Sequence, residues 1–103
     1  MDYKKAELLA KSWVEIISEG AFAIVPTATI TKPYGWVFFY QSKAFLETNE
    51  YQHALAGNAP ILVNRITDEI IATGTANTID KYLADYEMKI PPAWLKMHPE
   101  RPR

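Results

Sequence analysis

The chain has 103 residues, no cysteine and a formal net charge of −1. This length predicts one domain with a single core, and the lack of cysteine excludes disulfides and zinc sites of the thiolate type. The charges are unevenly spread, because residues 1–88 hold seven Lys/Arg and eleven Asp/Glu whereas residues 89–103 hold four and one. A mildly acidic globular part argues against a phosphate-binding surface, so we expect no nucleic-acid partner.

Residues 1–20 carry charges throughout and lack the apolar core of a signal peptide. The sequence also lacks the run of about eighteen apolar residues that predicts a membrane span. We therefore expect a cytoplasmic protein with no membrane partner. Its predicted organisation is a single α+β domain over residues 1–88, followed by a basic, proline-rich tail over residues 89–103.

The first predicted element is a helix from about Tyr3 to Glu19, capped by Asp2 and ended by Gly20. Glu7 and Lys11 are in the favourable order for an exposed ion pair. The residues that share one face at helical spacing, and that we expect to pack on a sheet, are Ala6, Leu9, Trp13, Ile16 and Ile17.

An aromatic and β-branched run over residues 35–42 predicts a central strand buried on both faces. Alternation sends Trp36, Phe38 and Tyr40 to one face and Val37, Phe39 and Gln41 to the other. The preceding residues 21–32 predict its antiparallel neighbour, joined by a turn at residues 33–35. Pro26 cannot donate to a ladder, so this neighbour is expected to be an edge or to be bulged there. Its threonines, Thr27, Thr29 and Thr31, are predicted to share one wet face.

After this hairpin we expect a short helix from Glu50 to Ala56, with Asn49 as its N-cap and Gly57 as a left-handed terminator. The apolar residues of this region that we expect to close one end of the core are Phe45, Leu46, Tyr51 and Leu55. Two further short strands, over residues 61–65 and 69–73, predict a second hairpin in which Asp68 adopts the turn geometry.

A last helix is predicted after Asn77 or Thr78, one of which caps it. Its apolar face contains Ile79, Tyr82, Leu83 and Tyr86. The fold expected from these elements is α+β, with an N-terminal helix, a four-stranded and mainly antiparallel sheet, a short connecting helix and a C-terminal helix. The tail cannot build a core, and we expect it to be dispensable for stability unless Trp94 docks on the domain.

The sequence has no glycine-rich phosphate loop, no nucleophile elbow and no helical pair of histidines. His53 is the one histidine before the tail, and without a second ligand or a nearby nucleophile it is interpreted as a packing or surface residue. Asp80, Asp85 and Glu87 are interpreted as a solvated acidic surface rather than a metal site. We therefore predict no enzyme activity, no catalytic residue, no metal and no cofactor.

Five blocks in one order resemble a known family: Gly35-Trp36-x-Phe38-x-Tyr40, residues 45–48, residues 56–60, residues 73–76 and Tyr82-Leu83-x-Asp85-Tyr86. Together they resemble the YrhB-like family, the thirty-fifth numbered immunity-protein family of bacterial polymorphic toxin systems, over residues 5–87. The resemblance implies an α+β protein that is encoded beside a toxin and binds it to protect the producing cell. It supplies no catalytic residue.

A binding protein of this kind must act through exposed residues, where an acidic patch can steer association with a basic site. The candidate partner-binding residues are five carboxylates and three aromatic anchors: Glu47, Glu50, Asp80, Asp85, Glu87, Tyr34, Tyr51 and Tyr86. Two alternatives stay open, a chaperone-like or general protein-interaction module and a small enzyme. The sequence also leaves a homodimer open.

Overall fold

The computed structural model describes residues 1–54 and 59–102, so the predicted Gly57 terminator and the end of the predicted helix at Ala56 lie outside the described residues. A four-stranded antiparallel sheet has the order β2-β3-β5-β6, with β2 at Ile30–Lys32, β3 at Gly35–Phe38, β5 at Ile61–Asn64 and β6 at Ile70–Ala72. A second pair joins β1 (Phe22–Ile24) to β4 (Tyr40–Ser42). The predicted α+β class is confirmed.

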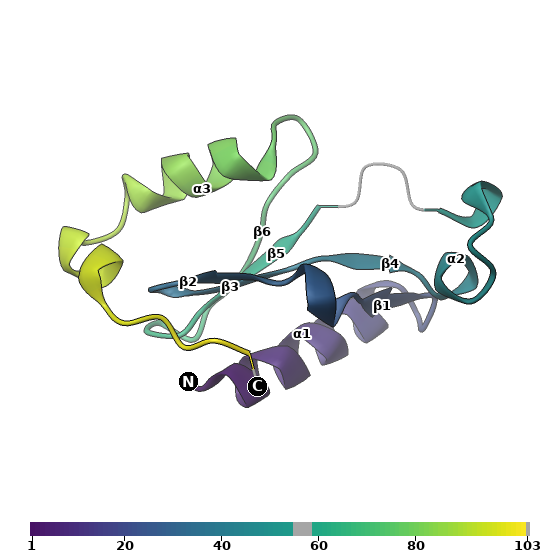
Figure 1. The fold of residues 1–103 in the computed structure, drawn as a ribbon, viewed down its shortest axis with the longest axis horizontal. Helices are drawn as coiled ribbons and strands as arrows, with labels where there is room; N and C mark the ends of the chain where they lie inside the picture. Colours follow the sequence, from purple (N-terminus) through teal and green to yellow (C-terminus); the bar gives the residue numbers. More distant parts are fainter. Residues whose placement is uncertain (55–58, 103) are drawn as a thin grey trace.

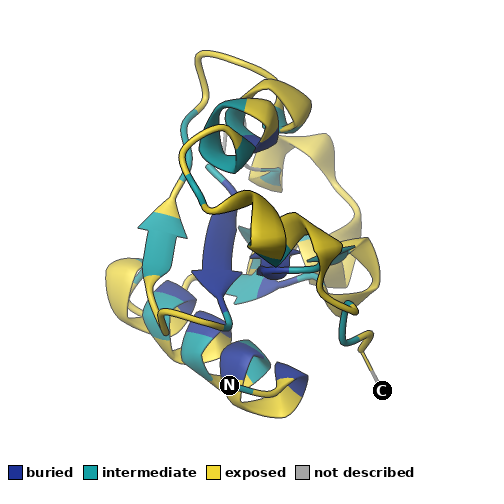
Figure 2. Cartoon of the chain, turned by 90° about the vertical axis from the view of Figure 1, so that its left-hand side faces the viewer, coloured by how far each residue is buried: buried dark blue, intermediate teal, exposed yellow. Residues whose placement is uncertain are grey.

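Two helices cover opposite faces of the sheet (Figure 1). Helix α1 (Tyr3–Ile17) packs on the face that carries Trp36 and Phe38, and α3 (Ile79–Glu87) packs on the face that carries Val37 and Leu62. Figure 2 shows the buried residues gathered in the sheet between them. The short α2 (Lys43–Thr48) lies beyond the sheet, at the end where β1 and β4 pair.

The aromatic run is central, as predicted, but the single strand expected over residues 35–42 is divided at Phe39 into β3 and β4, which belong to different sheets. Every residue of β3 is buried. Trp36, Phe38 and Tyr40 belong to the core cluster under α1, whereas Val37 and Phe39 belong to the cluster under α3. A residue with a side chain would not fit at Gly35, because a Cβ there would lie 2.0 Å from the carbonyl oxygen of Val63 in β5. Gly35 therefore lets β3 and β5 approach closely.

Pro26 interrupts the neighbouring strand, as predicted. It opens the 3₁₀ turn η1 (Pro26–Ala28), which divides this strand into β1 and β2. Thr27 lies in that turn, so the predicted alternation of three threonines on one face is wrong at this position.

The stripe predicted for the first helix is wrong at its C-terminal end. Ala6 is buried, but Ile16 is 76% exposed and Ile17 is also exposed. The face that meets the sheet consists of Tyr3, Ala6, Ala10 and Val14. Small side chains at the centre of this face let the helix backbone approach the rings of the aromatic strand, and the larger Leu9 and Trp13 lie half-buried on one flank.

The region after β4 also differs from its prediction. Helix α2 starts directly after the strand, with Ser42 as N-cap, and Asn49 ends it in the left-handed conformation at φ 58°. Asn49 is thus a C-cap rather than an N-cap. Asparagine suits the C-cap position because it tolerates positive φ. Where a helix from Glu50 to Ala56 was predicted, the described part of the chain forms the 3₁₀ turn η2 (Tyr51–His53). Leu46 and Tyr51 are exposed, so they do not close the core, whereas Phe45 is half-buried and Leu55 lies outside the described residues.

The second hairpin and last helix are confirmed. Asp68 adopts φ 63° in the turn between β5 and β6, and the Thr78 side chain caps α3 by accepting a hydrogen bond from the backbone N–H of Lys81. The segment after α3 contains the 3₁₀ turn η3 (Pro92–Lys96), and Trp94 packs against the core cluster under α3.

That segment continues past the end of the sheet to the start of α1 (Figure 1). The backbone carbonyl of Glu100 accepts a 2.7 Å hydrogen bond from Nε1 of Trp36, and the Glu100 carboxylate accepts one from the N–H of Tyr3. Arg65 donates to the His98 carbonyl at 2.6 Å. Together with the packing of Trp94 under α3, these contacts attach the tail to both faces of the sheet.

Candidate partner-binding surfaces

The eight predicted partner-binding residues fall into two separate regions of the molecule. Glu47 lies on α2, Tyr51 lies on η2 and Glu50 precedes η2, at one end of the long axis (Figure 1). The other five lie on α3 or beneath it: Tyr34, Asp80, Asp85, Tyr86 and Glu87. The structure therefore does not bring the whole set together.

Residues 43–53, which we call the arm, are held in shape by local hydrogen bonds. The Ser42 hydroxyl accepts from the backbone N–H of Phe45 at 3.1 Å at the start of α2. At its end, the Thr48 hydroxyl donates to the Ala44 carbonyl at 2.7 Å and accepts from the N–H of Glu50 at 3.2 Å. With both ends of α2 capped, the arm presents its side chains from a defined backbone.

Tyr51 is the most prominent side chain of the arm, because 89% of it is exposed. Its ring packs against that of Phe45 in a tilted arrangement, with 6.3 Å between the centroids. Leu46 is exposed beside them. An aromatic ring that is exposed yet supported from below loses little conformational freedom on binding, which is the property of an interface anchor.

The charges around this ring are mainly acidic. Glu47 is exposed. The Glu50 carboxylate accepts a 2.9 Å hydrogen bond from the side-chain amide of Gln52 and lies 3.5 Å from Nε2 of His53. Lys43, the basic residue of the arm, is 3.2 Å from Glu15 of α1. The arm therefore carries two exposed carboxylates near Tyr51, of which Glu50 already has partners within the arm.

Tyr34 is fully buried, and its hydroxyl donates to Glu87 at 2.7 Å. Lys32 lies 3.4 Å from the same carboxylate oxygen. Burial, followed by the neighbouring Glu87 carboxylate, raises the pKa of the Tyr34 phenol well above its ordinary value of 10.0. Tyr34 and Glu87 thus fix α3 to the β2–β3 turn, and neither side chain is free to meet a partner.

Tyr86 is also tied into the fold. Its ring lies 5.5 Å from that of Tyr34, and its hydroxyl accepts a 2.7 Å hydrogen bond from the side-chain amide of Asn64. The side-chain oxygen of this fully buried asparagine accepts from the backbone N–H groups of Ile66 and Thr67. Asn64 was not among the residues predicted from the sequence, although an asparagine at a strand end before a turn is a signal of such a role.

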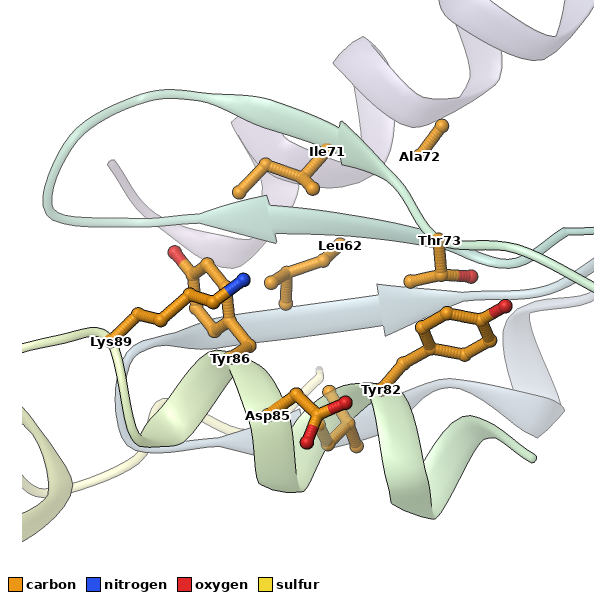
Figure 3. Close-up of a pocket in the computed structure, with 9 residues that line it drawn as sticks. Leu62, Ile71, Ala72, Thr73, Tyr82, Asp85, Tyr86 and Lys89 are labelled. Atoms are coloured by element: carbon orange, nitrogen blue, oxygen red, sulfur yellow. The ribbon is translucent and has the colours of Figure 1, made fainter. Parts of the chain in front are cut away.

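The remaining two carboxylates, Asp80 and Asp85, lie on α3. Asp80 is exposed in the first turn, where a negative charge is favourable, and Asp85 pairs with Lys81 at 2.9 Å. Asp85 also borders a groove of about 310 Å³ between α3 and the β5–β6 hairpin. Figure 3 shows Tyr82 and Tyr86 reaching from α3 toward this hairpin, which contributes Leu62 and Ile71. The groove was not predicted from the sequence.

Within residues 1–54 and 59–102, no group of three or more histidine, aspartate and glutamate side chains is placed to hold a metal ion. None of the helices in this described part of the chain is long and apolar enough to cross a membrane. The arrangement that remains is a small α+β domain with an exposed aromatic and acidic arm at one end and an apolar groove at one edge.

Comparison with known proteins identifies the class to which this domain belongs. The profile of the family described as immunity protein 35 matches residues 4–88. The chain therefore belongs to the immunity protein 35 family, and the resemblance predicted from the five sequence blocks is confirmed.

A curated relative is the "Uncharacterized protein YrhB" of Escherichia coli (strain K12), which is 44% identical over 55 residues. This match covers 53% of the present chain and 58% of the relative, so the chain spans little more than half the length of that protein. No solved structure matches the chain significantly.

Proposed function

We propose that this protein binds a cognate bacterial toxin in the cytoplasm of the producing cell and neutralises it without catalysis. The observation that carries the proposal is membership of the immunity protein 35 family across residues 4–88, which includes nearly every element of the fold. Inhibition by binding needs a stable scaffold and an exposed contact surface, and the domain provides both.

We place the toxin contact on the arm. Tyr51 supplies an exposed aromatic anchor supported by Phe45, and Glu47 and Glu50 supply negative charge beside it. A buried aromatic anchor commonly accounts for about 2 kcal/mol or more of binding free energy. The flanking carboxylates would chiefly accelerate association with a basic site, because exposed charges steer encounter more than they hold the complex.

The α3 residues support this assignment by contrast. Tyr34, Tyr86 and Glu87 are held by contacts within the domain, and Asp85 is already paired with Lys81. Using Tyr34 for a partner would require opening the core beneath α3. Binding at the arm requires no such rearrangement, because Tyr51 is already exposed to solvent.

The proposal is tested by co-expressing the protein with the toxin encoded beside its gene. One variant changes the arm, with Tyr51→Ala, Glu47→Lys and Glu50→Lys together. A control variant changes α3, with Asp80→Lys and Asp85→Lys. We expect wild type and the α3 variant to protect the cell, and we expect the arm variant to fail although it remains folded.

The two parts of the proposal give different failures. Protection lost in the α3 variant and kept in the arm variant would contradict the arm assignment but leave the immunity function standing. A wild-type protein that neither binds the neighbouring toxin nor protects against it would contradict the function itself.

A further inference from the structure

Strand β6 is an edge of the four-stranded sheet, paired only with β5. The backbone N–H of Asn64 donates to the Glu69 carbonyl and that of Thr73 donates to the Pro60 carbonyl. Since alternate residues of an antiparallel strand bond to the same neighbour, these two bonds fix the orientation of the strand. Ile70 and Ala72 therefore direct their backbone groups away from β5, and among the described residues nothing pairs with them.

Apart from its short length, this edge lacks the features that keep sheet edges apart. Within Ile70–Ala72 there is no proline, no lysine and no charge. Ile70 and Ile71 are half-buried, and Ala72 is exposed. Figure 2 shows β6 at the outer edge of the sheet, between α1 and α3.

Apolar surface continues on both sides of the edge. On the α3 side lies the groove floored by Leu62, Ile71 and Leu83. On the α1 side, Lys11 and Glu15 border β1, so the opposite flank of the helix faces the β6 side of the sheet. That flank carries half-buried Leu9 and Trp13 and the 76% exposed Ile16.

We propose that β6 pairs with β6 of a second copy of this chain, antiparallel about a two-fold axis at Ile71. In this register Ile70 of each copy bonds to Ala72 of the other, which uses every outward-facing backbone group of both residues. Ile71 meets its own copy on the groove face, where a pair of β-branched side chains is favourable. The result is a continuous sheet that runs through both copies.

The charges around the edge are compatible with a second copy. The same register places Glu69 opposite Thr73, so the carboxylate does not face itself. Asp85, which pairs with Lys81 of its own copy, and Lys89 both line the groove, so each copy brings both signs of charge to the two-fold axis. The apolar flank of α1, with Ile16 and Trp13, adds area that three-residue strands alone could not supply.

The arm remains free in this dimer, because it lies at the far end of the sheet from the β5–β6 turn (Figure 1). Each dimer would thus present two arms. The inference does not rest on the proposed function, and the two are tested by different measurements.

The test is the mass of the purified chain in solution over a concentration series up to about 200 µM. Wild type is expected to reach twice the chain mass of 11.7 kDa. Ala72→Pro removes an outward N–H that β5 does not use, so the folded chain should survive while the dimer dissociates at least about tenfold more readily. Ala72→Val, which keeps the N–H, is the matched control and should remain dimeric.

Ile16→Lys is a second variant that leaves the strand intact and should also weaken the dimer, since it places a charge in the apolar flank. In hydrogen exchange, the amides of Ile70 and Ala72 should become protected as the wild-type concentration rises. A wild type that stays monomeric throughout the series would overturn the proposal, as would a dimer that resists both Ala72→Pro and Ile16→Lys. Toxin binding abolished by Ala72→Pro in a monomeric protein would assign the edge to the toxin instead.

Discussion

Asn64 connects three parts of the structure through one buried side chain. It closes the β5–β6 turn by accepting from the N–H groups of Ile66 and Thr67, at 2.8 and 3.0 Å, and it joins the sheet to α3 by donating to Tyr86. A fully buried amide is tolerated because each of its polar atoms has a partner.

We predict that Asn64→Ala lowers the free energy of unfolding by about 2 to 4 kcal/mol, because three hydrogen bonds are lost and two backbone donors are left without their acceptor. Tyr86→Phe removes only the bond to α3 and should cost about 1 kcal/mol. Urea denaturation of the two variants provides the comparison. Equal losses would contradict the central role of the turn contacts.

The buried phenols predict a particular response to alkaline pH. Burial, followed by the Glu7 hydrogen bond, raises the pKa of Tyr3 to about 12, and burial followed by Glu87 raises that of Tyr34 further still. The folded state therefore holds protons that the unfolded state releases. The contribution of these two protonated phenols to the free energy of unfolding is complete below about pH 10. It is lost as the pH rises above that value, by about 1.4 kcal/mol per pH unit for each phenol.

Tyr34→Phe should accordingly make the alkaline loss of stability less steep. Unfolding free energies at several pH values between about 9 and 11 should give a smaller slope for the variant than for wild type. Parallel curves for the two proteins would show that Tyr34 ionises in the folded state as readily as in the unfolded state.

At the scale of elements, the prediction from sequence succeeded where local chemistry sets the structure. The aromatic strand, its two faces, the interruption at Pro26 and the Asp68 turn all follow from residue type and alternation. It was wrong where packing between elements decides. Ile16 has the right spacing for a core stripe, but the helix turns its small residues toward the rings of Trp36 and Phe38.

For the candidate site, too, residue type allowed some predictions and packing between elements decided the rest. Residue type identified Glu47, Glu50 and Tyr51 as suitable for a partner, and the structure places them together on the arm. The same reasoning selected Tyr34, which is buried, because an aromatic side chain suits a core and an interface equally well. Asn49 was assigned to the wrong end of a helix since it is favoured at both ends.

The tail is the element whose importance depends most on docking. The division of the chain at residue 88 remains a prediction, but Trp94 packs on the core and Glu100 accepts the N–H of buried Trp36. We therefore predict that deleting residues 92–103 lowers the melting temperature by more than about 5 °C. Deleting only residues 101–103 should change it little. Equal melting temperatures for the long deletion and wild type would mean that the tail is dispensable.

Across the whole molecule, the fold keeps the two proposed contact surfaces apart. The arm and the β6 edge lie in different regions of a molecule that is 43 Å long and 20 Å thick. A toxin bound at the arm would leave the edge of the sheet open, and pairing at the edge would leave both arms accessible. If both proposals hold, a chain of 103 residues serves two partners from one core.

Toxin binding by the arm is tested by the association and dissociation rates of the purified pair at low and high salt. We predict that Tyr51→Ala accelerates dissociation and weakens affinity by about 30-fold or more, whereas Glu47→Lys with Glu50→Lys chiefly slows association at low salt. Raising the salt should slow wild-type association toward that of the charge variant. Affinity and salt dependence unchanged in both variants, with wild type still bound, would contradict the arm as the toxin-binding surface.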